Sequence, residues 1–434
     1  MILVQTTSIQ IQAKVIDIID EMTQDWDVDD LDEQISEETQ LIQNLGFTSV
    51  DFIQLFVTIE DTFQKKLGFH DLIMRDGQYI EDLSVAQLVA FIQNRFNTTT
   101  VSHPQNDSVK IAPLPDHDKI NPAKVAQLRY TILSPDEFPD SSTSKNPAAL
   151  FILCPPRSGS TLLRVILAGH PRLFAPPELH LLTYQTLAQR KAALSNEFNH
   201  HLLNGTIRAI KQIRGCNSEQ AQRIMEEFED QQLTTKQFYH QLQQELGDRI
   251  LIDKTPSYSY HLNILKRIEA NFDNALYIHL VRHPYGTIRS FEDAKLDQLV
   301  PFMKNSPFSR RELAELIYLI SHQNILEHLK SVPTHRQIRI RFEDVVKSPQ
   351  LTIKKICDFL GLERHPDMLN PYQEKNQRMT DGVQVVSQMS GDLKFHLHSG
   401  IDSSMADRWQ QYHTVDFLGE ITWDMAKSFG YEGV

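Results

Sequence analysis

The feature that most constrains the fold is a strand, turn and helix pattern between residues 150 and 168. The apolar run 150–153 is typical of a buried parallel strand. Two prolines end it, and the turn Arg-Ser-Gly-Ser-Thr at 157–161 leads into an apolar helix over 162–168. Such a turn directs free backbone N–H groups and the positive end of a helix dipole into one concavity. The pattern therefore predicts an α/β unit with an anion site.

Side chains of the turn add to this site. Arg157 supplies a permanent cation, and Ser158, Ser160 and Thr161 supply hydroxyl donors. The nearest well-known loop is Walker A, Gly-x4-Gly-Lys-[Ser/Thr], but here Gly159 is the one glycine and no lysine precedes the hydroxyl residues. We expect the loop to hold a phosphate-like group without being built as an ATPase.

The acidic charge of the chain is concentrated at its N-terminus. Residues 1–97 hold 18 acidic and 5 basic residues, a net charge of −13, whereas 98–434 hold 38 of each. A general nucleic-acid binder would show a basic footprint, and neither part has one.

Several other classes of protein are disfavoured by simple patterns. No apolar run approaches the roughly 20 residues of a membrane-spanning helix, and no secretory signal is visible. Cys154, Cys216 and Cys357 have no paired spacing, so neither a disulfide framework nor a metal site is expected. A cytoplasmic location fits best.

Composition divides the 434 residues into three parts. Residues 1–97 have amphipathic helical patterns around 9–19, from Ser49 and from Ser84. Residues 98–148 are rich in Pro, Ser and Thr and are interpreted as a linker with one helical patch, 122–130. From 149 to 434, helical stretches separate four apolar strands, which predicts a parallel sheet covered by helices on both faces. These strands are 150–153, 249–252, 275–281 and 337–341.

Residues 44–51, Asn-Leu-Gly-Phe-Thr-Ser-Val-Asp, resemble the attachment loop of acyl and peptidyl carrier proteins, usually Gly-x-Asp-Ser-Leu. Thr48 and Val50 depart from that pattern, and Ser49 matches the modified serine. The resemblance implies that 1–97 form a small all-α four-helix carrier domain with 4′-phosphopantetheine on Ser49. A serine before a helix is also a common N-cap, and that alternative stays open.

The loop 156–162 resembles the 5′-phosphosulfate loop of sulfotransferases, whose donor is 3′-phosphoadenosine-5′-phosphosulfate (PAPS). The resemblance implies a P-loop-like parallel sheet similar to that of nucleotide kinases. A second family element is the strand that ends in Arg282 and the helix that bears Ser290, both of which hold the donor's 3′-phosphate in the family. The donor residues so implied in the loop are Arg157, Ser158, Gly159, Ser160, Thr161 and Leu162.

The resemblance also implies catalytic residues, among them Arg157. Glu178 lies 21 residues beyond Arg157, where the tyrosylprotein branch has its general base. Lys254, in Asp-Lys-Thr-Pro, matches the lysine that faces the transferring sulfuryl group. Histidine is the base in the cytosolic branch and suits proton removal near neutrality, so His261 is an equal candidate and His180 a third.

The resemblance suggests two further residues. Arg208 is a candidate for lining the acceptor pocket. Residues 391–396 and 406–409 resemble the family's donor-closing loop, which makes Lys394 a candidate for the 3′-phosphate.

The combination of carrier and sulfotransferase resembles the terminal modules of cyanobacterial polyketide synthases that make terminal alkenes. It implies sulfuryl transfer from PAPS to the β-hydroxyl of a carrier-tethered acyl chain, with a tether that raises the effective concentration. The implied partners are polyketide or fatty-acid synthase enzymes, a phosphopantetheinyl transferase and, where the sulfate is eliminated, a separate thioesterase. The alternatives are a free small-molecule or peptide hydroxyl as acceptor with the carrier as a docking module, a non-catalytic carrier and docking protein, and a P-loop small-molecule kinase.

Overall fold

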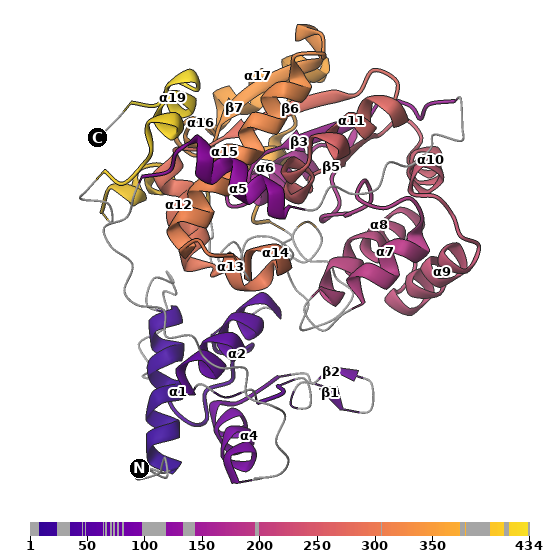
Figure 1. Ribbon diagram of the computed structural model, residues 1–434. Coiled ribbons are helices and arrows are strands. Elements are labelled where there is room, and N and C mark those ends of the chain that lie inside the picture. The colour runs from indigo at the N-terminus through magenta and orange to yellow at the C-terminus, as the bar shows by residue number, and fades with distance from the viewer. Residues whose placement is uncertain are drawn as a thin grey trace. The chain divides into compact units, whose positions relative to one another are not determined.

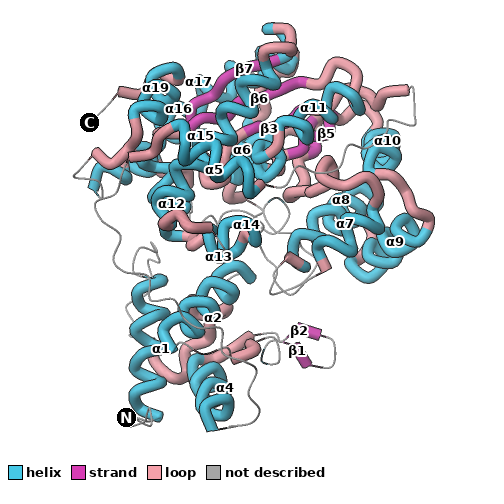
Figure 2. Tube along the Cα trace, in the orientation of Figure 1, coloured by secondary structure: helices cyan, strands magenta, loops and turns pink. Residues whose placement is uncertain are grey.

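The computed structural model contains two compact units, residues 1–118 and 119–434, which are described separately. Figure 1 labels their elements and Figure 2 shows their secondary structure. The structure describes residues 8–23, 35–45, 47, 49–63, 65, 67–69, 72, 74–75, 78–79, 82–97, 119–132, 144–195, 199–304, 306–373, 378, 400–411 and 416–432.

The described part of the first unit is mainly helical, as expected. It comprises α1 (Ser8–Thr23), α2 (Ser49–Phe63), α4 (Val85–Asn97) and a small antiparallel hairpin of β1 (Met74–Arg75) and β2 (Gln78–Tyr79). α2 begins at Ser49, where a helix was predicted.

The start of α4 has a local cause. The Ser84 Oγ accepts from the Gln87 N–H at 3.2 Å, and the Gln87 Oε1 accepts from the Ser84 N–H at 2.9 Å, which is a capping box. Asp82 anchors the turn at 41–45, which precedes α2, because its two carboxylate oxygens accept from the N–H groups of Ile42 and Gln43. These contacts hold the loop before α2 against the start of α4.

The second unit is built on a five-stranded parallel sheet, which confirms the predicted α/β class. Its spatial order is β4 (Leu173–Phe174), β5 (Ile250–Asp253), β3 (Leu150–Leu153), β6 (Leu276–Val281) and β7 (Gln337–Arg341). All four neighbouring pairs are parallel. The four predicted strands agree with the structure to within one residue, whereas β4 was missed because two residues carry no pattern.

Alternation along β3 builds the two faces of the sheet. Leu150 and Ile152 lie in a core with α6 (Ser160–Ala168) and α17 (Pro349–Leu360). Phe151 and Leu153 lie in a second core with α10 (Thr235–Leu246) and α11 (Leu262–Asn271). All four side chains are at most 2% exposed, as expected for a sheet covered on both faces (Figure 1).

The remaining helices complete these layers. α5 falls within the segment interpreted as a linker, and its Val125 and Leu128 pack in a core with α15. The predicted domain boundaries stay a prediction. These helices are α5 (Pro122–Thr131), α7 (Leu187–Leu194), α8 (Asn204–Arg214), α9 (Ser218–Asp230), α12 (Pro284–Asp293), α13 (Leu296–Leu299), α14 (Pro301–Lys304), α15 (Arg310–Leu329), α16 (Phe342–Lys347) and α19 (Glu420–Ser428).

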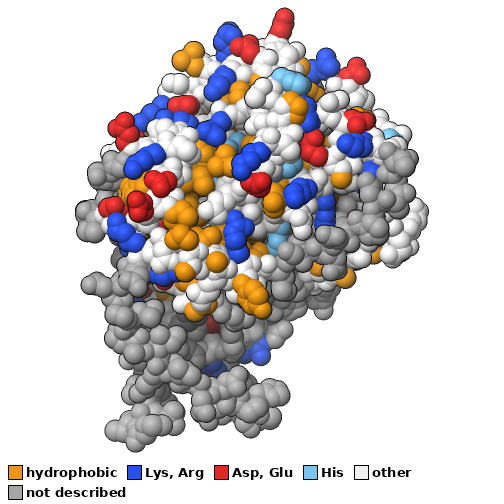
Figure 3. Space-filling model, turned by 45° about the horizontal axis from the view of Figure 1, so that its top comes forward, with side chains coloured by type: hydrophobic (Ala, Val, Ile, Leu, Met, Phe, Trp, Pro, Cys, Tyr) orange, Lys and Arg blue, Asp and Glu red, His pale blue; other side chains and the backbone are white. Residues whose placement is uncertain are grey.

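The surface is mixed in charge. Figure 3 shows Lys and Arg side chains interspersed with Asp and Glu over the described part of one face. Within the described residues, no helix combines the length and apolar character that crossing a membrane requires.

Candidate active site

The carboxyl ends of four neighbouring strands contribute the candidate residues. β3 leads into the turn with Arg157, β4 toward Glu178, β5 into Lys254 and β6 into Arg282. The chain leaves β3 toward β4 and β5 on one side and reaches β6 and β7 on the other. Ligands of open parallel sheets bind at this reversal, so the topology brings the predicted donor and catalytic residues to one edge.

The donor loop depends on one glycine. Gly159 has φ +81° and precedes α6, and a Cβ there would lie 2.2 Å from the Phe342 Cδ2. The ring of Phe342 therefore packs directly under the turn. Because the first N–H groups of a helix have no intrahelical partner, this turn aims the start of α6 at the concavity.

Arg157 is hydrogen-bonded to both Arg282 and Ser290, the other two residues that the resemblance assigns to the anionic groups of the donor. Arg157 itself has φ +66°, an uncommon conformation for a residue with a Cβ. Its carbonyl accepts from the Arg282 Nη1 at 3.0 Å, and its Nε donates to the Ser290 Oγ at 3.1 Å. Two guanidinium groups are thereby held beside one hydroxyl at the sheet edge, an arrangement suited to a phosphate or sulfate group.

The C-terminal segment also reaches this edge. The ring of Trp409 stacks on that of His283 with centroids 4.0 Å apart, directly after Arg282. Residues 406–409 thus lie near the donor elements, where the sequence placed a closing loop. Lys394, the other residue assigned to that loop, lies outside the described residues.

Glu178 and Lys254 form a buried ion pair with an Oε1 to Nζ distance of 2.5 Å. The Lys254 side chain is 1% exposed and that of Glu178 11%. The His180 Nε2 lies 3.2 Å from the second carboxylate oxygen of Glu178, without the alignment of a hydrogen bond. Three of the predicted catalytic side chains therefore meet.

The pKa of Glu178 reflects opposing causes. Burial alone raises the pKa, but the charge of Lys254 and the nearby His180 outweigh it and hold the pKa well below its ordinary value. A carboxylate so stabilised is ionised but weakly basic.

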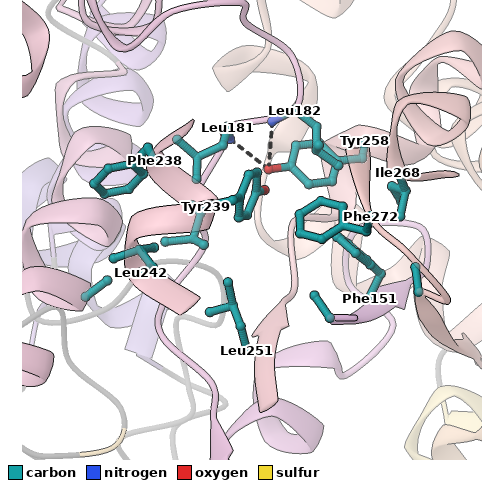
Figure 4. Close-up of a cluster of buried hydrophobic side chains, with 14 of the residues drawn as sticks. Phe151, Leu181, Leu182, Phe238, Tyr239, Leu242, Leu251, Tyr258, Ile268 and Phe272 are labelled. Carbon is teal, nitrogen blue, oxygen red and sulfur yellow. Dashed lines mark hydrogen bonds between the residues drawn. The ribbon is translucent and has the colours of Figure 1, made fainter. Parts of the chain in front are cut away.

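A buried network holds both halves of this pair. Figure 4 shows the Tyr258 hydroxyl accepting from the N–H groups of Leu181 (2.8 Å) and Leu182 (3.3 Å), which follow Glu178 along the chain. The same hydroxyl donates to Asp253 at 3.1 Å, the residue directly before Lys254. Tyr239 also donates to this carboxylate. Tyr258 therefore ties the loop of Glu178 to the strand end of Lys254.

Among the described residues, no ion pair or hydrogen bond joins the side chain of His261 to Glu178 or Lys254. It follows the 3₁₀ turn Pro256–Tyr260 and is half-buried. Burial, with a smaller contribution from Arg267, lowers its pKa to about 4. Among the described residues, the side chain of Glu178 pairs with Lys254 and lies within ion-pair distance of His180. His180, the third candidate base, is therefore adjacent to Glu178, whereas no described ion pair or hydrogen bond joins His261 to Glu178.

Arg208 is buried on α8, whose Gly205 contacts the backbone of Glu178. The residues that the sequence reasoning missed are supporting ones: Phe342, Tyr239, Tyr258 and the carboxylate of Asp253. Asp253 was within the Asp-Lys-Thr-Pro motif, and its place directly before Lys254 was its one available signal. Tyr239 and Phe342 carry no local signal.

Comparison with known proteins agrees with this geometry. A sulfotransferase family model matches residues 147–367. A sulfotransferase domain from the curacin biosynthetic pathway is 39% identical, with a TM-score of 0.62, and the match covers 67% of this chain and 99% of that one. The sulfotransferase domain of the Synechococcus PCC 7002 olefin synthase is 36% identical, with a TM-score of 0.61 and coverage of 69% and 100%.

A third relative is the nodulation protein NoeE of Sinorhizobium fredii, 26% identical over 303 residues. That match covers 66% of each protein, so the chain spans just under two thirds of this relative's length. The strand order, the loop at Gly159 and the family match lead to one conclusion: the chain belongs to the sulfotransferase family.

Proposed function

We propose that this enzyme transfers the sulfuryl group of PAPS to the β-hydroxyl of an acyl chain carried on 4′-phosphopantetheine at Ser49. Membership in the sulfotransferase family implies a PAPS-type donor. The observation that carries the proposal is the buried Glu178–Lys254 pair, which follows β4 and β5 at the same carboxyl edge of the sheet at which β3 leads into the loop of Arg157. Relatives from the curacin biosynthetic pathway and from an olefin synthase support a role in a biosynthetic pathway of that kind.

The proposed residues have complementary tasks. Arg157, the N–H groups of α6, Arg282 and Ser290 hold the anionic groups of the donor. Lys254 stabilises the oxygen that leaves sulfur as the new S–O bond forms. Glu178 takes the proton of the acceptor hydroxyl, with His180 as the adjacent alternative and His261 as the more distant one.

The acceptor is tested by mass spectrometry of the whole chain. Ser49 is loaded with a 3-hydroxyacyl phosphopantetheine by a phosphopantetheinyl transferase and incubated with PAPS. We expect the loaded chain to gain the mass of one SO3 group, and a chain loaded with the matching acyl group without the hydroxyl to gain none. Loading without any SO3 gain would refute the tethered acceptor. The control Ser49→Ala should not load at all, and loading that persists would refute Ser49 as the attachment site.

The competing acceptors predict different results. A free small molecule or peptide as acceptor predicts equal turnover by the Ser49→Ala variant. A kinase predicts tight ATP binding, whereas the proposal predicts that calorimetry finds tight binding of adenosine 3′,5′-bisphosphate and weak binding of ATP.

A further inference from the structure

A buried carboxylate next to the donor residues has no task in the proposed chemistry. Glu343 is the second residue of α16, directly after Phe342, and is 8% exposed. Its Oε1 accepts from the His283 N–H at 2.9 Å, and its Oε2 accepts from the Tyr431 hydroxyl at 2.7 Å. Among the described residues Glu343 forms no ion pair, so these two neutral groups hold its carboxylate.

The His283 N–H belongs to the peptide group that joins Arg282 to His283. The carbonyl of the same peptide group, that of Arg282, accepts from the Tyr318 hydroxyl of α15 at 3.4 Å. His283 precedes the first turn of α12, which begins at Pro284, so its buried N–H has no partner within that helix. Because a peptide group is planar, contacts from α15 and α16 at its two ends fix its orientation. They thereby fix where the Arg282 side chain leaves the end of β6.

The side chain of Arg282 has little room to compensate for a backbone shift. Its Cζ lies 4.4 Å from the centroid of the Phe342 ring, and a Cβ at Gly286 would lie 3.0 Å from its Nε. Its Nη1 donates to the Arg157 carbonyl at 3.0 Å. A guanidinium confined in this way moves with the peptide group to which it is attached. Its alignment with a bound anion therefore depends on Glu343.

Tyr431 connects Glu343 to the C-terminal segment. It follows α19, is 3% exposed, and has the Arg341 Cζ 4.4 Å from the centroid of its ring. Burial, with the charge of Glu343 as the next cause, raises the pKa of both Tyr318 and Tyr431, so both hydroxyls keep their protons and can donate. Hydrogen bonds to a charged acceptor are stronger than those between neutral groups. Removing this charge should therefore loosen the peptide group that follows β6.

We propose that Glu343, held in place by Tyr431, is a positioning residue that raises the affinity for the donor through Arg282. The inference rests on the proposed function, in which Arg282 holds an anionic group of PAPS. It extends that function to a buried carboxylate that contacts the backbone of a donor residue rather than the donor.

Donor affinity is measured by calorimetry of the full chain with adenosine 3′,5′-bisphosphate. Glu343→Gln keeps the shape of the side chain but removes its charge and its second acceptor oxygen. We expect the Kd to rise about tenfold, as when one charge-assisted contact is misaligned. An unchanged Kd in this variant, with a wild type that binds the ligand, would overturn the inference alone. A wild type that does not bind would refute the proposed function, and the inference with it.

Glu315→Gln is a closely matched control. Glu315 of α15 is 2% exposed and accepts from one N–H and one hydroxyl of the C-terminal segment, those of Gly419 (2.8 Å) and Thr422. Among the described residues it forms no hydrogen bond with the peptide group that follows β6. Burial raises its pKa to about 7, so the comparison is made at pH 8, where it is largely ionised. We expect the free energy of unfolding to fall in both variants but donor affinity to fall only in Glu343→Gln. An equal loss of affinity in the control would refute positioning.

A double-mutant cycle tests the route through Arg282. If Glu343 acts by positioning Arg282, the effect of Glu343→Gln on the Kd should disappear in an Arg282→Gln background, because no guanidinium is left to misplace. Additive losses would mean that Glu343 acts on the donor by another route, and would overturn the inference.

Tyr431→Phe is a second, milder variant, which decides the question if Glu343→Gln does not fold. It keeps the ring on Arg341 and removes only the hydroxyl that holds Glu343, so the Kd should rise about two- to fivefold. In either variant the KM for PAPS should rise by the same factor as the Kd, with kcat unchanged. An unchanged Kd in Tyr431→Phe, or a loss confined to kcat, would contradict positioning.

Discussion

The donor side and the base side of the candidate site are organised by different means. On the donor side, the turn at Arg157 and Gly159 is held in left-handed backbone conformations by Arg282 and by close packing on Phe342. On the base side, Glu178 and Lys254 are 76 residues apart and are held by a balance of buried charges. We therefore expect that, in the proposed function, backbone shape governs donor binding and charge balance governs proton removal.

The largest effect should come from breaking the charge balance. Lys254→Met removes the cation expected to stabilise the leaving oxygen, so kcat should fall by about 10² to 10³. Because the substitution also strands a buried carboxylate, the free energy of unfolding should fall by about 3–5 kcal/mol. Activity assays and urea denaturation measure the two effects.

A double variant separates catalysis from stability. Lys254→Met with Glu178→Gln removes both charges of the pair, so neither is left buried without the other, and the double variant should regain most of the stability and none of the activity. Activity recovered by the double variant would contradict both catalytic assignments. Lys330→Met is the control, because Lys330 forms an exposed surface pair with Glu327 and its loss should leave the free energy of unfolding nearly unchanged.

A backbone change tests the donor side. Gly159→Ala introduces a Cβ at φ +81° and 2.2 Å from Phe342. We expect about 1–3 kcal/mol of destabilisation from the backbone conformation and more from the overlap. Calorimetry should show weaker binding of adenosine 3′,5′-bisphosphate, by about tenfold or more if the turn misaligns even one charge-assisted contact.

Two further variants separate the cost of the backbone conformation from the cost of the steric overlap. Gly361→Ala has a similar φ of +66° with nothing within 4 Å of the added Cβ, so it measures the conformational cost alone. Adding Phe342→Ala to Gly159→Ala should relieve the overlap and, measured against Phe342→Ala alone, leave that conformational cost. An unchanged donor affinity in Gly159→Ala would contradict the role assigned to backbone shape.

The same contrast explains what the sequence could predict. The donor side was accessible because its residues follow strands whose apolar patterns are local, as at 150–153 and 275–281. The base side was only partly accessible, since a resemblance suggested Glu178 and Lys254, but their pairing depends on two strands far apart in the chain. Phe342 and Tyr239 were not predictable, because their contacts with Gly159 and Asp253 arise only when distant segments pack together.

Removing one hydroxyl tests the positioning network. Tyr258→Phe leaves two backbone N–H groups without their acceptor and should cost about 1–3 kcal/mol of stability. Because the loop of Glu178 loses its tie to Asp253, kcat should fall about tenfold while the KM for PAPS is unchanged. Tyr239→Phe is the control: the Tyr239 hydroxyl donates to Asp253, and the described hydrogen bonds to the backbone of Leu181 and Leu182 belong to Tyr258, so stability should fall and kcat should not. Equal losses of kcat in both variants would argue against positioning by Tyr258.

The smallest expected effect is on the free energy of unfolding at acidic pH, and it depends on the Glu178–Lys254 pair of the base side. Lys254 and His180 hold the pKa of Glu178 in the folded chain well below its unfolded value of about 4.3. The stabilisation is therefore complete above that unfolded value. It declines as the pH falls, by at most about 1.4 kcal/mol per pH unit, because the unfolded chain takes up the proton first.

Burial raises the pKa of Asp253, so this group has the opposite effect and favours the folded chain as the pH falls. Asp253 is present both in the wild type and in the Lys254→Met, Glu178→Gln double variant, so its contribution cancels in their difference. Urea denaturation should show the stability advantage of the wild type over the double variant shrinking as the pH is lowered from 6 toward 3.5. A difference that stays constant over this range would mean that the Glu178–Lys254 pair does not set the charge balance.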